Sequence, residues 1–326
     1  MIADVAASTA ARPSLASANL PSTSTNAYGR LLAGGTPLEV PADQLGDYLE
    51  KNRRSPTSLL AAFHATGDKA FLNEAMQAYP NDVRVAMSAV LEGGLSAEER
   101  QRWIAGFKQL APENALANYL SAADYLKSGQ TEQAMQELVT VAGKSGFQDY
   151  WFDACQNAEE AYRAAGYSEV DAKIAATSMR VPEFLEMREL DHNLANLAQT
   201  LVQAGNKEQA QAVVQSGLAL GQFLTDRNAR ESLGQYVMGL QIQQQFLGIM
   251  DPNSPLGGLG GTVQSQLDEI SQRLQIFKDL TQTQNALLPT LADEDLINYA
   301  DHFKVFGGVQ TLNWLVSTYG NQSMQR

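Results

Sequence analysis

Apolar residues recur every three or four positions from about residue 40 onward, a pattern typical of amphipathic helices. The clearest instance is a 34-residue pattern that is present twice, at 115–148 and 191–224. The matched offsets carry Asn118/Leu194, Ala122/Ala198, Tyr125/Leu201, Gly129/Gly205, Ala134/Ala210 and Leu138/Val214. Such a recurrence predicts stacked helix–turn–helix units that bury their apolar faces against one another.

Further helices are predicted on both sides of these copies. Extending the 34-residue step backwards gives a unit at 81–114, in which Ser96 and Glu99 form a capping box for the second helix. Residues 149–190 hold a longer, irregular helical unit between the copies. Proline and glycine stops place shorter helices before residue 80.

The two ends of the chain have different patterns. Residues 1–40 are rich in Ala, Ser, Thr, Pro and Gly, and we expect a disordered tether in which a short helix is allowed at 27–33. Residues 251–262 form a Pro- and Gly-rich linker. The predicted division is therefore a tether at 1–40, a helical repeat array at 41–250, this linker, and capping helices at 263–326.

The stretch 263–288 is predicted to be one helix with an apolar stripe at coiled-coil spacing. The stripe consists of Val263, Leu267, Ile270, Leu274 and Phe277. It fits a helix that packs back on the array, and it also fits a helix through which copies of the chain associate. Pro289 is expected to end this helix, and Gly307 with Gly308 to turn the next one.

The spacing of small residues, glycine and alanine in the two copies resembles the tetratricopeptide repeat. The resemblance is clear over two units and extends weakly across about residues 55–248, and the region 48–82 is also similar to bacterial repeat proteins of unassigned function. The resemblance implies an all-α fold: a TPR-like α-solenoid of stacked helix–turn–helix units, with a disordered N-terminal tail and a C-terminal helical cap.

The resemblance also implies a concave surface, lined by the first helix of each unit, that receives a peptide or helix of a partner protein. The positions that line it are Leu116, Tyr119, Ala123, Leu126, Lys127, His192, Ala195, Gln199, Val202 and Gln203. Lys127 alone is cationic among them, so an extended segment or a helix fits better than the C-terminal carboxylate that many family members clamp. Packing against the next repeat is the competing interpretation of each position.

Charge and composition narrow the partner class. The net charge of −13 is opposite to the basic surface that nucleic acid requires. No apolar run is long enough to span a bilayer, so an integral membrane protein is not expected. The start of the chain lacks the pattern of a signal peptide, which indicates a cytoplasmic protein if the start is genuine, and a periplasmic or membrane-tethered one if an upstream anchor is missing.

Candidate catalytic residues are sparse. His64, His192 and His302 are far apart and match no metal-binding spacing, and the single cysteine, Cys155, is expected to be a buried thiol. We therefore expect no metal, no cofactor and no enzymatic activity.

The expected function is a non-catalytic protein-interaction scaffold. One alternative is a structural protein that self-associates through the 263–288 helix. In that case the partner is another copy of the chain, and the protein is a homo-oligomer. The other is a helical-barrel enzyme acting on glycans, with carboxylates at Glu159–Glu160 or Asp293–Asp295.

Overall fold

All regular structure in the described part of the chain is helical. The computed structural model describes residues 26–34, 38, 40–141, 143–226, 231–256 and 261–323. Within these ranges there is no strand, and only two isolated bridges, Asn114–Gly146 and Pro255–Thr262, join extended backbone. The all-α prediction is confirmed. The first 25 positions of the expected tether, and residues 257–260 of the expected linker, lie outside the described residues.

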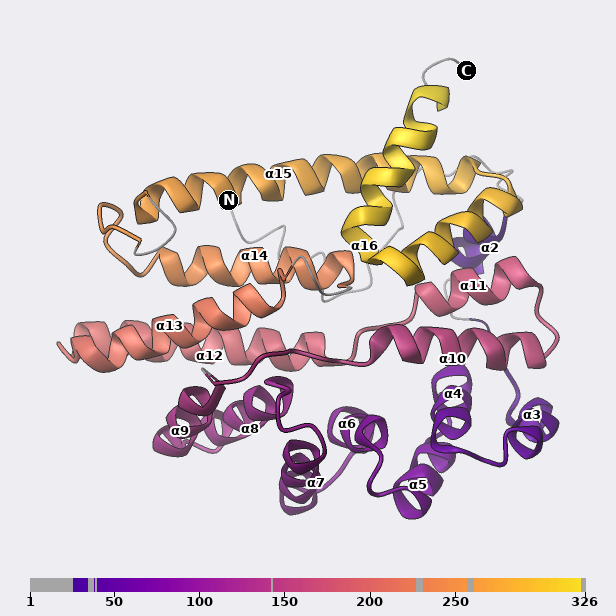
Figure 1. Ribbon diagram of the computed structural model, residues 1–326, viewed down its shortest axis with the longest axis horizontal. Coiled ribbons are helices and arrows are strands. Elements are labelled where there is room, and N and C mark those ends of the chain that lie inside the picture. Colours follow the sequence, from indigo (N-terminus) through magenta and orange to yellow (C-terminus); the bar gives the residue numbers. More distant parts are fainter. Residues whose placement is uncertain are drawn as a thin grey trace. The chain divides into compact units, whose positions relative to one another are not determined.

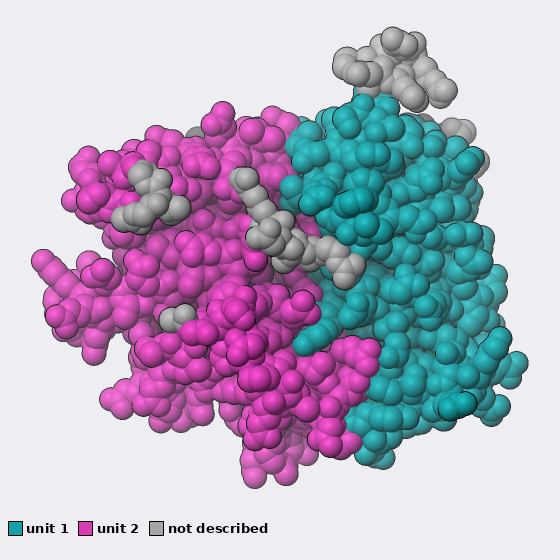
Figure 2. Space-filling model, viewed as in Figure 1, with its two compact units in different colours: residues 1–79, 150–181, 280–326 teal, residues 80–149, 182–279 magenta. Residues whose placement is uncertain are grey.

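The helices group into two compact units, which Figure 2 colours separately. Unit 1 comprises residues 1–79, 150–181 and 280–326, and unit 2 comprises residues 80–149 and 182–279. The elements of unit 1 are α2 (Ala27–Gly34), η1 (Ala42–Leu45), α3 (Gly46–Lys51), α4 (Pro56–Thr66), α5 (Lys69–Ala78), α10 (Trp151–Ala164), α11 (Glu169–Thr177), η2 (Leu288–Thr290) and α16 (Asp293–Ser323). Those of unit 2 are α6 (Val83–Glu92), α7 (Ala97–Leu110), α8 (Leu116–Lys127), α9 (Thr131–Val141), α12 (Glu183–Gln203), α13 (Lys207–Phe223) and α14 (Leu233–Leu247), and α15 (Val263–Leu287) begins in unit 2 and ends in unit 1 (Figure 1).

In unit 2 the two copies of the 34-residue pattern are direct neighbours. Each copy is a helical hairpin, α8 with α9 and α12 with α13; α8 packs on α12 and α9 packs on α13. The stretch 149–190 does not fold as one unit between them. Its residues 150–181 belong to unit 1, and Glu183 already begins α12.

The two hairpins turn in the same way because the matched residues have the same conformation. Gly129 and Gly205 have φ of 75° and 78°, in the left-handed region that side chains with a Cβ disfavour. The turn after each glycine is closed by equivalent backbone bonds, Gln130 N to Tyr125 O at 2.8 Å and Asn206 N to Leu201 O at 2.9 Å. The pattern in the sequence therefore corresponds to a shared turn geometry.

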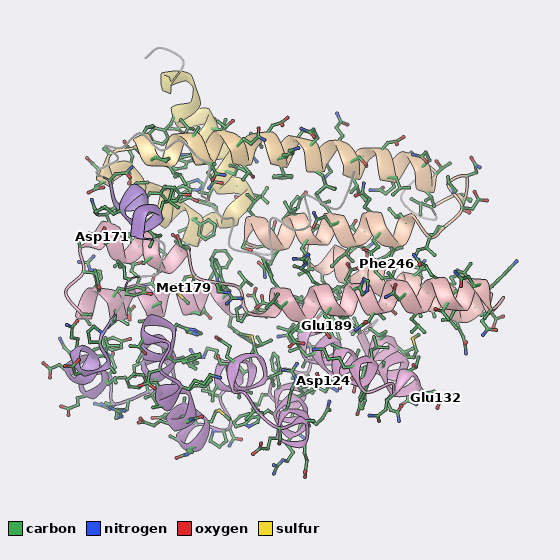
Figure 3. All side chains as sticks on the ribbon, turned by 180° about the vertical axis from the view of Figure 1, so that it is seen from behind. Asp124, Glu132, Asp171, Met179, Glu189 and Phe246 are labelled. Carbon is green, nitrogen blue, oxygen red and sulfur yellow. The ribbon has the colours of Figure 1, made fainter. Side chains whose placement is uncertain are left out.

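Small residues occupy several buried positions on the helices of unit 2. Ala122 and Ala198 have no exposed surface, and Ala134 and Ala210 are exposed by no more than 4%. Farther along, Gly217 of α13 lies against the ring of Phe246 on α14, where an added Cβ would come within 2.1 Å of the ring; Figure 3 labels Phe246 on that helix. Small residues thus allow the two hairpins and α14 to pack closely on one another.

The first hairpin of unit 2 has the capping that the sequence predicts. Helix α7 begins after Ser96, whose side chain accepts a hydrogen bond from Glu99 N while the Glu99 carboxylate accepts one from Ser96 N. This reciprocal pair satisfies two N–H groups that the first turn leaves without helical partners. The predicted capping box is confirmed.

Unit 1 is built around α4, α10, α11 and α16. Helix α10 packs on α4 and α11, and α11 packs on α16 and on α2. Cys155 is fully buried in a cluster with Trp151, Phe152 and Phe303, which confirms the expected buried thiol. Helix α2 falls where a short helix was allowed within the expected tether, at Ala27–Gly34.

Proline and glycine end the C-terminal helices at the expected places. Helix α15 ends at Leu287, and Pro289 lies in the short η2 that follows. Gly307 has φ 79° and ψ 179°, so it breaks α16 into two helical segments that bend at that point in Figure 1.

We expect alanine at the two turn glycines to destabilise the fold similarly. Gly129→Ala and Gly205→Ala each place a Cβ at positive φ with no other steric change, at a cost of about 1 kcal/mol in the free energy of unfolding. The matched control is Gly106→Ala in the interior of α7, which meets open space and is expected to stabilise by up to about 1 kcal/mol. Urea denaturation of the three variants measures these differences; equal effects at all three positions would contradict the shared turn geometry.

Candidate interaction surface

The ten predicted partner-binding positions all lie in unit 2, on α8 and α12, and they differ in exposure. Leu116, Tyr119, Ala123 and Ala195 are at most 3% exposed, and Leu126 is half-buried. Tyr119 is packed by Phe147 and Phe223, whose ring centroids are each 6.4 Å away. The exposed positions are Lys127, His192, Gln199, Val202 and Gln203. The surface available to a partner is therefore mainly on α12.

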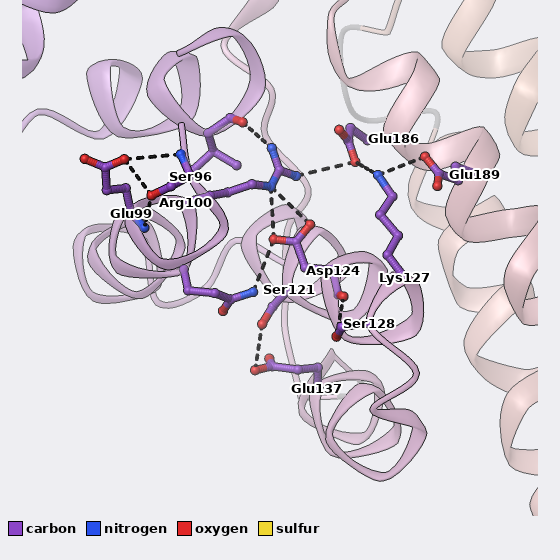
Figure 4. Close-up of polar contacts among 12 residues, drawn as sticks. Ser96, Glu99, Arg100, Ser121, Asp124, Lys127, Ser128, Glu137, Glu186 and Glu189 are labelled. Atoms are coloured by element: carbon purple, nitrogen blue, oxygen red, sulfur yellow. Dashed lines mark hydrogen bonds and ion pairs between the residues drawn. The ribbon is translucent and has the colours of Figure 1, made fainter. Parts of the chain in front are cut away.

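Lys127 is engaged by two carboxylates of α12 (Figure 4). Its Nζ lies 3.1 Å from Glu186 and 2.8 Å from Glu189. Partial burial lowers the pKa of the Lys127 ammonium, but the hydrogen bonds and charges of Glu189 and Glu186 outweigh this effect and raise it. Lys127 thus stays charged, and its charge is neutralised within the protein. Lys127 is therefore not available to pair with the C-terminal carboxylate of a partner protein.

The Glu186 carboxylate also pairs with Arg100, and the ion pairs of Arg100 connect three helices. Arg100 of α7 contacts Asp124 of α8 at 2.9 Å and Glu186 of α12 at 3.4 Å. These three side chains are only 15–21% exposed, so solvent screens their attraction less than that of surface pairs. Figure 4 shows the continuous network, and Figure 3 places Asp124 and Glu189 in the fold. The network holds α12 in a defined orientation on α7 and α8.

The exposed face of α12 carries a stripe of polar side chains, which we call the α12 stripe. It consists of Glu189, His192, Asn196, Gln199 and Gln203, at steps of three and four residues. Asn196 and His192 are hydrogen-bonded to each other at 3.0 Å. Two exposed apolar side chains flank the stripe, Leu185 at 54% and Val202 at 51% exposure.

The sequence analysis named His192, Gln199 and Gln203 as candidate binding positions and did not name Glu189 and Asn196. It started the helix at the repeat boundary near residue 191, whereas α12 begins at Glu183 and forms one continuous helix of 21 residues. The polar steps at 189, 192, 196, 199 and 203 are visible in the sequence. These five side chains lie on a single helix face only if the helix is continuous from residue 189 to residue 203.

Unit 2 also brings together two acidic side chains that sequence reasoning did not single out, the buried Glu183 and the half-buried Asp149. Glu183, the first residue of α12, is 1% exposed and lies beside Asp149. Gln235 of α14 donates from its amide to both carboxyl groups, and its Oε1 accepts from Ser232 N at 2.7 Å. Burial, and secondly the charge of Asp149, raise the pKa of Glu183 well above its usual range. The surroundings of Glu183, buried and beside the Asp149 carboxylate, therefore favour its protonated form.

The apolar stripe of α15 is covered within unit 2. Val263, Ile270 and Phe277 are at most 8% exposed, and Leu267 and Leu274 are half-buried. The Phe277 ring packs against Tyr236 of α14 with 4.9 Å between centroids, and Arg273 hydrogen-bonds to the Tyr236 hydroxyl. Self-association through this stripe would first require its release from α14.

The carboxylate of Glu159, a candidate for glycan chemistry, is held by lysines in unit 1. Lys304 Nζ lies 2.5 Å from Glu159 Oε2, and Lys173 Nζ lies 3.7 Å from Oε1. Both Glu159 and Lys173 are only 8% exposed, and Asp301 extends the ion network at Lys173. This arrangement neutralises buried charge, which is a structural role.

Comparison with protein-family models, curated proteins and solved structures gives no match. Among the described residues, no group of three or more His, Cys, Asp and Glu side chains is arranged to hold a metal ion. None of the helices in the described ranges is both long and apolar enough to cross a bilayer.

The buried Glu183 predicts that its own contribution to the stability of the fold falls as pH rises. A folded-state pKa above the ordinary 4.5 means that the folded chain binds more protons than the unfolded chain. The stabilisation is thus fully present below about pH 4.5 and is lost as pH rises through the folded-state pKa. Burial acts in the same direction on Asp191 and Glu231, raising the pKa of each to about 7.

We expect Glu183→Gln, which keeps the shape and cannot ionise, to raise the melting temperature relative to the wild type at pH 7.5 and to match it near pH 4.5. Thermal unfolding followed by circular dichroism across this range measures the difference. The control is Glu208→Gln at an exposed position on α13, which should leave the pH dependence unchanged. A constant offset of Glu183→Gln at all pH values would contradict the proton-linked explanation.

Proposed function

We propose that the protein is a non-catalytic interaction scaffold with TPR-like stacked hairpins, and that an extended segment of a partner protein binds along the α12 stripe. The fold assignment is supported by the pairing of helices in unit 2. First helices pack on first helices (α8 on α12) and second helices on second helices (α9 on α13), as in an array of stacked units. Helix α14 continues this order by packing on both α13 and α12.

The observation that carries the proposal is the exposed row of amide side chains on α12. Each Asn or Gln amide both donates and accepts, so it can pair with a peptide group of any sequence. From His192 to Gln203 the helix rises about 16 Å at ~1.5 Å per residue, the length of about five residues of extended chain. An extended segment laid along this row could therefore satisfy its backbone groups repeatedly, with Val202 beside it for an apolar side chain and Leu185 two turns before His192.

The charge around the stripe favours neutral or cationic segments. The ion network beside the stripe has three carboxylates and two cations, and the whole chain carries a net charge of −13. A segment with Lys or Arg would meet complementary potential, whereas an acidic segment or a C-terminal carboxylate would be repelled.

We expect Gln199→Ala combined with Gln203→Ala to weaken peptide binding by about tenfold or more, because two or more hydrogen bonds are removed from an interface. The purified full chain is tested on an array of peptides of about 15 residues, and affinities of the retained peptides are measured by fluorescence anisotropy.

The matched control is Gln211→Ala combined with Gln215→Ala, which makes the same change at the same spacing on exposed positions of the neighbouring helix α13. Binding should be unaffected in the control. Equal affinity of both double variants and the wild type would show that the α12 stripe is not the binding surface, and a preference for acidic peptides would contradict the charge argument.

A further inference from the structure

Helix α2 is attached to unit 1 by directional contacts, beginning with Asn26. The Asn26 amide nitrogen donates to Leu288 O at 2.8 Å and to Leu291 O at 2.9 Å, two carbonyl groups at the end of the α15–η2 segment. Its Oδ1 accepts from Gly29 N at 2.8 Å and so caps α2 itself. Asn26 is only 8% exposed. One buried side chain therefore both starts α2 and binds it to a distant part of the chain.

Two polar contacts orient the helix on its site. Ala27 N donates to Asp293 Oδ1 at 3.1 Å, which fixes the first turn. The Arg30 guanidinium lies 2.7 Å from Asp171 and 4.0 Å from Asp293, so a cation of the segment faces two carboxylates of the site. These contacts require the segment to run in one direction along the site and to carry a cation at the position of Arg30.

The apolar side of α2 completes a hydrophobic cluster. Ala27 is 1% exposed, and Tyr28 and Leu31 pack against the same cluster. The wall that receives them is formed by Val170, Ile174, Leu287, Leu288, Leu291, Leu296, Tyr299, Ala300 and Leu315, which come from α11, the end of α15, η2 and α16.

This wall is held together by contacts that do not involve α2. Helix α11 packs on α16. Gln284 donates to the Tyr299 hydroxyl at 2.7 Å, and the Tyr319 hydroxyl donates to Asp295 at 2.9 Å. The site therefore keeps its walls and its carbonyl acceptors when α2 leaves.

Helix α2 has little stability of its own. It has eight residues, fewer than the ~12–15 that an isolated helix needs even to be marginally stable in water. The next element along the chain is η1. It packs on α3, α4 and α10 rather than on the α2 site. The segment can therefore detach by local opening, without unfolding the rest of unit 1.

We propose that the α2 site is a segment-binding site that exchanges its occupant, and that residues 26–34 of a second copy of the chain bind there in place of the chain's own. The contacts described for the segment, from the Asn26 amide to Leu31, are all made by consecutive residues, so the segment is recognised in the same way whichever chain carries it. The tethered segment competes at a high effective concentration, which keeps the exchanged form rare until the chain's own helix is weakened.

The test uses a fluorescent peptide of residues 22–36 and the full chain. In a detached variant of the full chain, Asn26→Ala with Leu31→Ala, the chain's own segment no longer occupies the site. We expect the peptide to bind this variant at least tenfold more tightly than the wild-type chain, and a peptide with Asn26→Ala to bind it about tenfold more weakly than the unmodified peptide. Hydrogen exchange at residues 27–34 reports detachment, and circular dichroism reports the overall fold.

Whole-chain exchange is tested by immobilising the detached variant and adding untagged wild-type chain, whose residues 26–34 are the only intact segment in the mixture. Retention that the free peptide competes away supports the proposal. A folded, detached variant that binds no peptide overturns the site. Continued protection of residues 27–34 in that variant overturns the assigned anchors, and peptide binding without whole-chain retention overturns the second copy as the occupant.

Discussion

Close packing of helices through small side chains is the constraint on which unit 2 depends. Ala122 and Ala198 are fully buried at equivalent places in the two hairpins, and the glycine that follows each turns the chain with the same positive φ. Because neither alanine has exposed surface, a larger side chain at either place would have to displace its neighbours. The Arg100–Glu186 contact joins α7 to α12, so it too depends on how closely the helices of unit 2 pack.

The charges of both units are largely used within the protein. In unit 2 the Lys127 ammonium is neutralised by Glu186 and Glu189, and in unit 1 the buried Glu159 is neutralised by Lys304 and Lys173. Lys127 and Glu159, which the sequence offers as candidates, are therefore paired within their own units. The exposed face of α12 carries amide side chains together with Glu189 and His192, and the proposed binding of a peptide segment uses those amides.

The sequence predicted the features that local physics determines. The capping box at Ser96, the turn glycines, the end of α15 before Pro289 and the break at Gly307 all follow from short-range backbone chemistry, and the structure confirms them. Three positions of the α12 stripe, His192, Gln199 and Gln203, were named from the sequence, because positions on a helix face can be counted along it.

Long-range pairing could not be predicted in the same way. Nothing in the local pattern of residues 150–181 shows that they fold with the chain ends rather than beside the second copy. The burial of Glu183 was also hidden, because a glutamate at the start of a helix ordinarily faces solvent and interacts with the helix dipole. Here it lies beside Asp149 and Gln235, which are brought to it by separate segments of the chain.

The order of the chain has a consequence for how unit 1 is completed. Its core joins residues far apart in sequence, and the contact between Ala27 and Asp293 spans 266 positions. Contacts of such separation form late, because loop-closure entropy opposes them until local structure exists. The two carbonyl groups that Asn26 binds belong to residues 262 and 265 positions away, so docking of α2 closes a long loop. We therefore expect α2 to dock after the elements that form its site, and the proposed exchange of segments uses this same step.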